Sequence, residues 1–311
     1  MDNVCHTLVG AALGRAGLSR RTRFGAATLM IAANLPDLDV LVFATGTPPV
    51  AFRRGWTHGV VAQLVLPIAL TAAVAFVASR RTPRVHGDTS PMPLSVRWLF
   101  LLSIIGVYSH LFLDYLNNYG VRLLSPIDWR WFYGDAVFIV DPVLWLALGA
   151  GVWLARRQHA RVPAVGALVF AVGYIVLMLL SAGAARDYVA RAWRTTRGIE
   201  PRAMMVGPAA LTPLSKEIIV DAGDRYESGS FTWWPPAVTF RPEAVPKNSH
   251  RPEVEAAIAS SEDVRGFLVW SRFPYWTLAP AEGGVRVTVQ DMRFRLRGGF
   301  TVSTVVASET D

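Results

Sequence analysis

Cysteine is nearly absent from this sequence, which has Cys5 alone among its 311 residues. A single cysteine excludes an internal disulfide framework and a zinc site built from several thiolates. We interpret Cys5 as a small apolar residue. The first ten residues, MDNVCHTLVG, also lack the basic cluster that opens a cleavable signal peptide, so we expect the first helix to be retained.

Charged residues are scarce as well. They make up 17% of the chain, whereas hydrophobic residues make up 52% and the mean hydropathy is +0.33. That balance is too apolar for an ordinary soluble protein and indicates a membrane protein with a polar part. The formal net charge is +8, but the arginines gather in short clusters between apolar runs, which suits membrane topology. We therefore expect no nucleic-acid partner.

Long apolar segments, by contrast, are abundant. The candidate helices occupy Val4–Leu18, Phe24–Gly46, Gly59–Ser79, Trp98–Leu116, Ala136–Ala155 and Val162–Gly183. The third and the last contain no ionisable residue and reach the roughly 20 residues that cross a bilayer, whereas the first is short enough to be tilted or re-entrant. The predicted fold class is an α-helical integral membrane bundle of about five or six membrane helices, followed by a small C-terminal mainly-β domain.

The pattern changes after residue 185. Residues 1–185 are predicted to form the transmembrane domain, 186–210 an arginine-rich connector and 211–311 a soluble, mainly-β domain. The predicted strands are KEIIVDA, YESGSFTW, GFLVWSR, VRVTVQ, RFRLR and FTVSTVVA, with turns at Gly283-Gly284 and Gly298-Gly299. One helix is expected near PEVEAAIASSE.

The arginine clusters predict the orientation. They comprise Arg15, Arg20, Arg21 and Arg23; Arg80, Arg81, Arg84 and Arg97; and Arg156, Arg157 and Arg161. If the helices alternate, these clusters share one side, which the excess of positive charge makes cytoplasmic. The tail begins with further arginines, but long domains are translocated despite such charges. We therefore predict a multi-pass protein of the bacterial inner membrane whose C-terminal domain is extracytoplasmic.

Histidines and aspartates converge on the side opposite the arginines. They are His6, Asp37 and Asp39 of NLPDLD, His58 of GWTHG, His110 with Asp114, and Asp141. His110 and Asp114 lie four residues apart within an apolar helix, so both face one way. Ionisable residues in a span are costly, and imidazole and carboxylate are ligands for zinc, manganese and iron. The pattern predicts a metal site.

Each residue alone has a simpler interpretation. His110 and Asp114 could be a hydrogen-bonded pair that packs helices, and Asp141, which precedes a proline, could cap a helix. The other histidines, His86, His159 and His250, lie in polar or arginine-rich segments and are interpreted as solvated.

The motifs resemble a known family. His6, PDLD at 36–39, RGWTH at 54–58, SHLFLDYLNNYGVRLLSP at 109–126 and IVDP at 139–142 occur in the order typical of the LexA-regulated, membrane-bound, metal-dependent hydrolase family (YdjM-type) of bacterial inner membranes. The resemblance covers about residues 1–185. It implies a metal-dependent hydrolase with His6, Asp37, Asp39, His58, His110 and Asp114 as metal ligands.

The chain departs from the family pattern at two positions. It has Arg53 where many members have a histidine, and Gly59 where a serine usually follows the histidine. One ligand and one hydroxyl are therefore missing, which leaves one or two metal ions open.

The predicted function is a membrane-embedded hydrolase that attacks a phosphoester or related ester, with a lipid ester as one candidate substrate. A divalent ion, zinc first and manganese or iron as alternatives, would lower the pKa of water and supply hydroxide. Asp141 or Asp39 is the candidate general base, and Arg54 and Arg122 are candidates for binding the substrate's phosphate. The bilayer is the expected partner, and the oligomeric state is left open.

Two alternatives remain at this point. The same His/Asp cluster could handle metal ions or protons without hydrolysis. It could also simply pack the helices while the β domain binds a partner.

Overall fold

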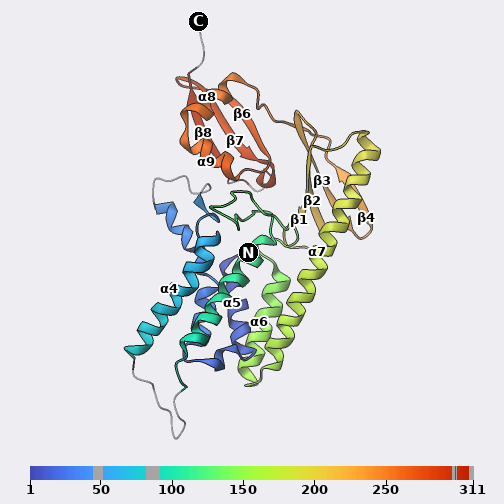
Figure 1. The fold of residues 1–311 in the computed structure, drawn as a ribbon. Coiled ribbons are helices and arrows are strands. Elements are labelled where there is room, and N and C mark those ends of the chain that lie inside the picture. Colours follow the sequence, from blue (N-terminus) through green and yellow to red (C-terminus); the bar gives the residue numbers. More distant parts are fainter. Residues whose placement is uncertain (45–51, 82–91, 296–297, 299, 308–311) are drawn as a thin grey trace. The chain divides into compact units, whose positions relative to one another are not determined.

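The computed structural model describes residues 1–44, 52–81, 92–295, 298 and 300–307. Arg84, His86 and Gly299 lie outside these residues. The chain divides into two compact units (Figure 1). A helical unit comprises Met1–Val40 and Arg54–Leu180, and a second unit comprises Leu41–Arg53 and Ser181–Asp311.

The helical unit is built from short and long helices. The short ones are α1 (Asn3–Arg15), the 3-10 helix η1 (Leu18–Arg21), α2 (Gly25–Ala32), the 3-10 helix η2 (Leu35–Ala44) and α6 (Pro142–Arg157); the long ones are α4 (Val60–Ser79), α5 (Val96–Tyr115) and α7 (Val162–Arg197). Of these, η2 continues into the second unit after Val40, and α7 continues into it after Leu180. Helix α1 packs against α2 and α6, and α5 packs against α2 and α4. Helices α2 and α5 approach closely at Gly106, where any side chain would collide with Ala32.

Among the described residues, α4, α5 and α7 are long and apolar enough to cross a membrane. Helix α2 and η2, which are bent by 50° relative to each other, would make a fourth span if they act as one. The predicted count of five or six is not confirmed, because α1 has 13 residues and α6 has 16. Both fall short of the roughly 20 residues that a span needs.

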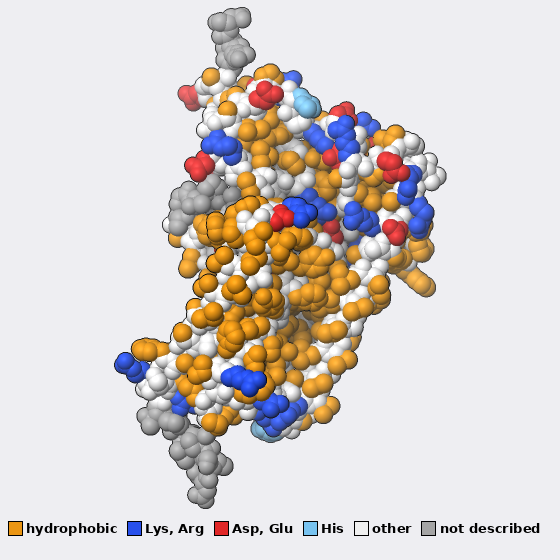
Figure 2. Space-filling view, viewed as in Figure 1, with side chains coloured by type: hydrophobic (Ala, Val, Ile, Leu, Met, Phe, Trp, Pro, Cys, Tyr) orange, Lys and Arg blue, Asp and Glu red, His pale blue; other side chains and the backbone are white. Residues whose placement is uncertain are grey.

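Arginine clusters that are far apart in the sequence meet at one end of the helical unit. The Arg23 guanidinium donates to the carbonyl oxygens of Ala78 and Arg81, and the Arg21 guanidinium lies over the ring of Trp98. Figure 2 shows basic side chains gathered at this end, beyond a broad hydrophobic surface. Arginines of two of the predicted clusters, Arg23 and Arg81, therefore lie close together in the helical unit.

The C-terminal part of the second unit contains two antiparallel sheets. The first has the order β1 (Ala203–Pro208), β2 (Ser215–Asp221), β3 (Arg225–Trp233) and β4 (Pro236–Phe240), with the short β5 (Val245–Pro246) also paired to β3. The second has the order β6 (Pro274–Ala281), β7 (Gly284–Asp291) and β8 (Thr301–Val306). Helices α8 (Pro252–Ser260) and α9 (Glu262–Trp270) contact the second sheet, and the 3-10 helix η3 spans Met292–Phe294.

The arginine-rich connector predicted at 186–210, with an interfacial helix as one option, contains the end of one helix and the first strand. Helix α7 continues to Arg197, and β1 begins at Ala203. The end of α7 is amphipathic: Val189 and Trp193 are fully buried in a core with Met204 of β1 and Phe231 of β3. This apolar face gives the end of the helix a sheet to pack on, so the helix does not end with its membrane-like stretch.

Two predicted strands are wrong. GFLVWSR forms the end of α9, where Val264, Phe267 and Trp270 are buried at helical spacing and the Ser261 hydroxyl caps the first turn. The described start of RFRLR belongs to η3. The other four predicted strands are present as β2, β3, β7 and β8.

One carboxylate in this unit makes stability depend on pH. Asp291 is buried; it accepts hydrogen bonds from the Ser271 hydroxyl at 2.7 Å and from the Arg293 side chain at 2.9 Å. Burial alone raises the pKa of Asp291, but Arg293 and the hydrogen bonds outweigh it, so the net pKa lies below its usual value. A carboxylate whose pKa is lower in the folded than in the unfolded state stabilises the fold at any pH above its unfolded pKa of about 3.9. This stabilisation is lost as the pH falls through the pKa of the folded state.

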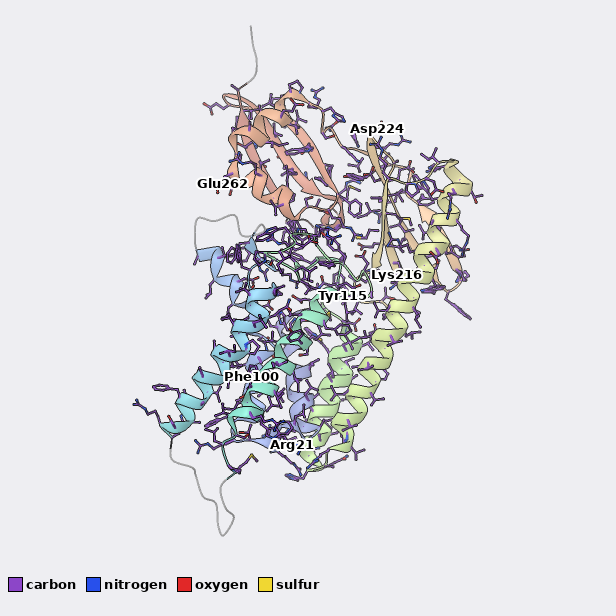
Figure 3. The ribbon with its side chains drawn as sticks, in the orientation of Figure 1. Arg21, Phe100, Tyr115, Lys216, Asp224 and Glu262 are labelled. Carbon is purple, nitrogen blue, oxygen red and sulfur yellow. The ribbon has the colours of Figure 1, made fainter. Side chains whose placement is uncertain are left out.

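We therefore expect β6 and β7 to open more readily below about pH 4, with little change between about pH 5 and 7. Asp291→Asn should lower their opening free energy by about 1–3 kcal/mol at neutral pH, because buried donors lose a charged acceptor. Hydrogen exchange of the β6–β7 peptides measures this. Asp224→Asn, which removes an exposed carboxylate (labelled in Figure 3), is the control and should change nothing. Equal protection in the two variants would contradict the prediction.

Candidate metal centre

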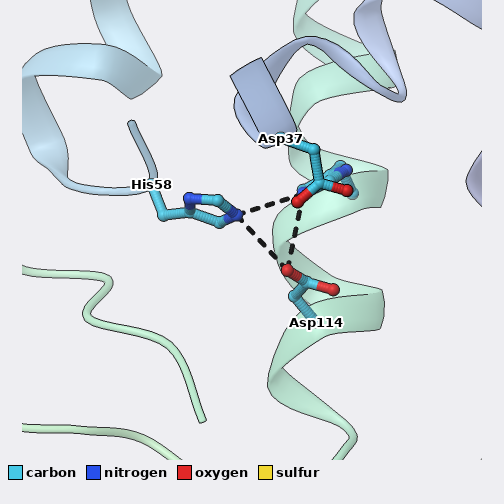
Figure 4. Close-up of side chains that lie close together, drawn as sticks. Asp37, His58 and Asp114 are labelled. Atoms are coloured by element: carbon cyan, nitrogen blue, oxygen red, sulfur yellow. Dashed lines mark hydrogen bonds and ion pairs between the residues drawn. The ribbon is translucent and has the colours of Figure 1, made fainter. Parts of the chain in front are cut away.

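Four of the predicted ligands meet in the helical unit. Asp37 comes from η2, His58 from the loop before α4, and His110 and Asp114 from α5. One ligand atom from each lies within 4.8 Å of all the others, and all four side chains are buried (Figure 4). These four residues, called the cluster below, could hold a metal ion.

The distances in the cluster fit a small cation. The Nε2 atoms of His58 and His110 are 3.1 Å apart, and they lie 3.3 and 3.4 Å from Oδ2 of Asp114. Two ligand atoms on a tetrahedral zinc ion lie about 3.3–3.4 Å apart when each is about 2.0–2.1 Å from the metal. Oδ2 of Asp114 is also buried without a hydrogen bond. The carboxyl oxygen of Asp37 is somewhat farther, 3.9 Å from His110.

The proton positions in both imidazoles follow from their partners. His110 Nδ1 lies 2.8 Å from the carbonyl oxygen of Ala33, which can only accept, so Nδ1 carries the proton. His58 Nδ1 lies 2.9 Å from the Thr57 hydroxyl, which itself donates to Asp39 at 3.1 Å, so this Nδ1 is protonated too. In the neutral rings both Nε2 lone pairs therefore point at one another.

Burial favours the neutral form of the His58 ring. Burial lowers the pKa of His58, and the nearby His110 lowers it further. Asp114 and Asp39 act in the opposite direction, but the net pKa still lies below its usual value. Two such lone pairs beside a carboxylate oxygen repel one another unless a proton or a metal ion lies among them. Imidazole and carboxylate are metal-ligating groups, so these four side chains could hold a metal ion.

His6 and Asp39 lie one contact away from the cluster. His6 Nε2 is 3.3 Å from Oδ1 of Asp114, and its ring stacks on His110 with centroids 3.9 Å apart. The amino group of Met1 also donates to Oδ1 of Asp114. Asp39 accepts from Thr57, which holds His58 in place. A carboxylate behind a ligating histidine is a common device for orienting the ring.

The two arginines with a predicted substrate role are both buried. Arg54 donates to Oδ1 of Asp114 at 3.1 Å and to Oδ1 of Asn117 at 3.2 Å. The guanidinium of Arg122 lies 5.1 and 4.7 Å from the rings of Trp129 and Trp131, and burial lowers its pKa. Arg54 thus touches the cluster directly, and its role in substrate binding stays a prediction.

Asp141 is not among the four cluster residues. Its Oδ1 accepts from the backbone of Leu144 and caps α6, and its Oδ2 accepts from the hydroxyl of Tyr174 at 2.8 Å. This agrees with the helix-cap alternative; the catalytic role stays a prediction. His159 and His250 are exposed, as expected.

Sequence reasoning gave no role to two polar residues near the cluster. Thr57 connects Asp39 to His58, and Asn117 accepts from Arg54. Asn117 is fully buried, and a buried asparagine needs polar partners, but the sequence alone does not show that burial.

Gly59, one of the departures from the family pattern, is explained by close packing. A side chain here would collide with both the hydroxyl and the carbonyl oxygen of Ser125. That carbonyl accepts from Val60 N at 2.8 Å, and the Ser125 hydroxyl donates to Gly55 O at 3.0 Å. Ser125 thus occupies the space of the missing side chain and anchors the loop that carries His58.

We expect Gly59→Ala to destabilise the helical unit by about 1–3 kcal/mol, because the overpacked loop must shift. Thermal unfolding in detergent measures this. Gly149→Ala, in α6, is the matched control: no described atom lies within 4 Å of the added carbon. It should be neutral or gain up to about 1 kcal/mol from helix propensity. The same melting temperature for both variants would refute the packing argument.

These features define a class: a membrane-associated protein with apolar helices and a buried His/Asp cluster able to bind metal. Residues 1–185 match the YdjM inner membrane protein family, and the chain belongs to that family. It is also 21% identical over 328 aligned positions to the "Uncharacterized protein YfhP" of Bacillus subtilis (strain 168), covering 98% of this chain and 90% of that protein. No solved structure matches it significantly.

Proposed function

We propose that this protein is a membrane-embedded, metal-dependent hydrolase of a phosphoester or related ester. The observation that carries the proposal is the close approach of three ligand atoms: the Nε2 atoms of His58 and His110 lie 3.1 Å apart, and each lies within 3.4 Å of Oδ2 of Asp114. A structural polar core would place a donor between such acceptors. Here the space between them suits a cation, and the family is one of inner membrane proteins.

A divalent ion bound by Asp37, His58, His110 and Asp114 would supply hydroxide at neutral pH by lowering the pKa of water. In the hydrolysis, the water oxygen bonds to phosphorus, the ester P–O bond breaks, and the departing alcohol takes up a proton.

Asp39 or Asp141 is the proposed general base. His6 and Asp39 support the ligands, and Arg54 and Arg122 are proposed to favour an anionic substrate group. Zinc is the first candidate, as one ion or two.

The proposal includes an orientation. The arginine-rich end of the helical unit would face the cytoplasm, which puts the cluster and the C-terminal domain on the extracytoplasmic side of a multi-pass protein. The contacts of Arg23 with Ala78 and Arg81 support a common side for two of these arginine groups.

A second candidate is a membrane protein that handles metal ions or protons without hydrolysis. The burial of all four cluster residues and the ion pair between Arg54 and Asp114 favour it, because a catalytic site needs access for substrate. Proton or metal flux into liposomes, with no hydrolysis, would select this alternative.

The first test is the metal content of detergent-purified protein. We expect about one or two transition-metal ions per chain in wild type after incubation with zinc and manganese. The double variant His110→Ala/Asp114→Ala should lose them while staying monodisperse. His250→Ala, which removes an exposed histidine, should keep the wild-type content. Wild type that carries no metal above background would remove the metal centre and the hydrolase proposal with it.

A further inference from the structure

An apolar groove lies between α4 and α5. Its volume is about 360 Å³, and it is lined by Gln63 of α4, by Tyr108, Leu111, Phe112 and Tyr115 of α5, and by Leu123 and Leu124 of the following loop. All of these residues belong to the helical unit. Apart from one amide and two phenol hydroxyls, the lining is hydrocarbon, so a polar ligand would find few partners there.

The groove opens on a surface that suits lipid. Both helices that flank it are long and apolar enough to span a membrane. Phe112 is 48% exposed and Leu124 is 41% exposed, whereas Leu111 at the floor is 4% exposed. Neighbouring α4 side chains such as Leu64 are exposed and apolar as well. In a bilayer the medium that meets this surface is acyl chain, and an apolar cavity of this kind does not hold water.

The groove and the cluster share helix α5. Leu111 follows His110 and Tyr115 follows Asp114, and successive residues of a helix are about 100° apart. The row that includes Leu111 and Tyr115 therefore runs beside the row that carries the two ligands. Figure 3 shows Tyr115 near the end of α5 at which Asp114 lies.

Gln63 provides a second connection between the groove and the cluster. Its amide donates to the carbonyl oxygen of His58 at 3.0 Å and to that of Leu123 at 2.8 Å. The groove wall is thus hydrogen-bonded to the backbone of a cluster residue.

We infer that this groove seats an acyl chain of a membrane phospholipid and so presents the lipid's phosphoester to the cluster. The occupant is one hydrocarbon chain that enters sideways from the bilayer between Phe112 and Leu124. The cleavage of the lipid's ester depends on the proposed hydrolase function, whereas the binding of the acyl chain is inferred from the groove alone. The substrate class is then a phospholipid rather than a water-soluble ester.

Photolabelling tests the site without any need for activity. The full chain is reconstituted in phosphatidylcholine/phosphatidylglycerol vesicles with a trace of phosphatidic acid that carries a diazirine on its acyl chain. We expect labelled peptides to contain residues 108–115 and 123–124, and the label to fall at least about fivefold in Leu124→Trp, whose indole fills the opening. Phe100→Trp, on α5 but outside the groove lining, should label like wild type.

A label spread over α4 and α5 in proportion to exposure, or unaffected by Leu124→Trp, would overturn the inference. So would cross-links showing that a second copy of the chain covers the groove. Turnover of long-chain phosphatidic acid relative to p-nitrophenyl phosphate gives the second readout. That ratio should fall at least about tenfold in Leu124→Trp. This equals a change of about 1.4 kcal/mol in the activation free energy for phosphatidic acid relative to that for p-nitrophenyl phosphate. Groove labelling with no hydrolysis of either compound by wild type would sink the proposed function and leave the lipid site standing.

Discussion

Asp114→Ala should bring hydrolysis of a phosphoester to background. Asp114 is the centre of the cluster: its Oδ2 faces the Nε2 atoms of His58 and His110, and its Oδ1 meets Arg54. Removing it takes away a metal ligand and the negative charge that balances the cation. Release of p-nitrophenol from p-nitrophenyl phosphate, measured with purified protein and added zinc, gives the rate.

Asp114→Ala alone could lose activity through misfolding, because it leaves the Arg54 charge without its carboxylate. His110→Ala separates the two causes. It removes a ligand but keeps the Asp114–Arg54 ion pair, so we expect loss of turnover with a nearly native elution profile. His159→Ala, which changes an exposed histidine, should retain full turnover. Wild-type turnover in His110→Ala would mean that the cluster is not the reaction centre.

The four cluster residues could be predicted from the sequence because membrane helices restrict the possibilities. A polar residue in an apolar helix needs a polar partner, so His110 and Asp114 had to face the protein interior. Alternation of the chain across the membrane then placed Asp37 and His58 at the same end. All four are found together.

The different positions of Asp37 and Asp39 could not be predicted. Both aspartates of NLPDLD were predicted to be metal ligands, as the family resemblance implies. The segment instead forms the 3-10 helix η2, in which residues two apart point about 120° from each other. Asp37 therefore reaches the cluster, and Asp39 reaches Thr57 and the backbone of Arg54.

Other errors have similarly local causes. In α9 the apolar and aromatic residues Phe267, Leu268, Val269 and Trp270 suggested a strand. The capping Ser261 and the acidic first turn favoured a helix, and the burial of every third residue decided it. Asp141 was ambiguous because the same carboxylate can cap a helix or act as a general base; it caps α6, and its catalytic role stays a prediction.

Arg54→Ala should destabilise the helical unit by about 3–5 kcal/mol, because it breaks a buried ion pair and leaves Asp114 with fewer cationic partners than the Arg54 guanidinium and the Met1 amino group together provide. The Arg54 side chain is 3% exposed and donates to Asp114, to Asn117 and, at 3.4 Å, to the carbonyl of Gly120. Residue 54 has a φ of 53°, a left-handed conformation that costs arginine and alanine alike. The difference in unfolding free energy between wild type and Arg54→Ala therefore measures the lost side-chain contacts and not backbone strain. Thermal unfolding in detergent, followed by circular dichroism, measures it.

The control is Arg130→Ala, which breaks an ion pair with Asp128 whose arginine side chain is 77% exposed. Solvent screens that pair, so we expect little or no loss of stability. The double variant Arg54→Ala/Asp114→Ala should be more stable than the sum of the two single losses predicts, since neither partner is left alone. If the losses simply add, the two groups do not interact in the folded protein. Arg54 would then be available for the substrate role that its position beside Asp114 otherwise restricts.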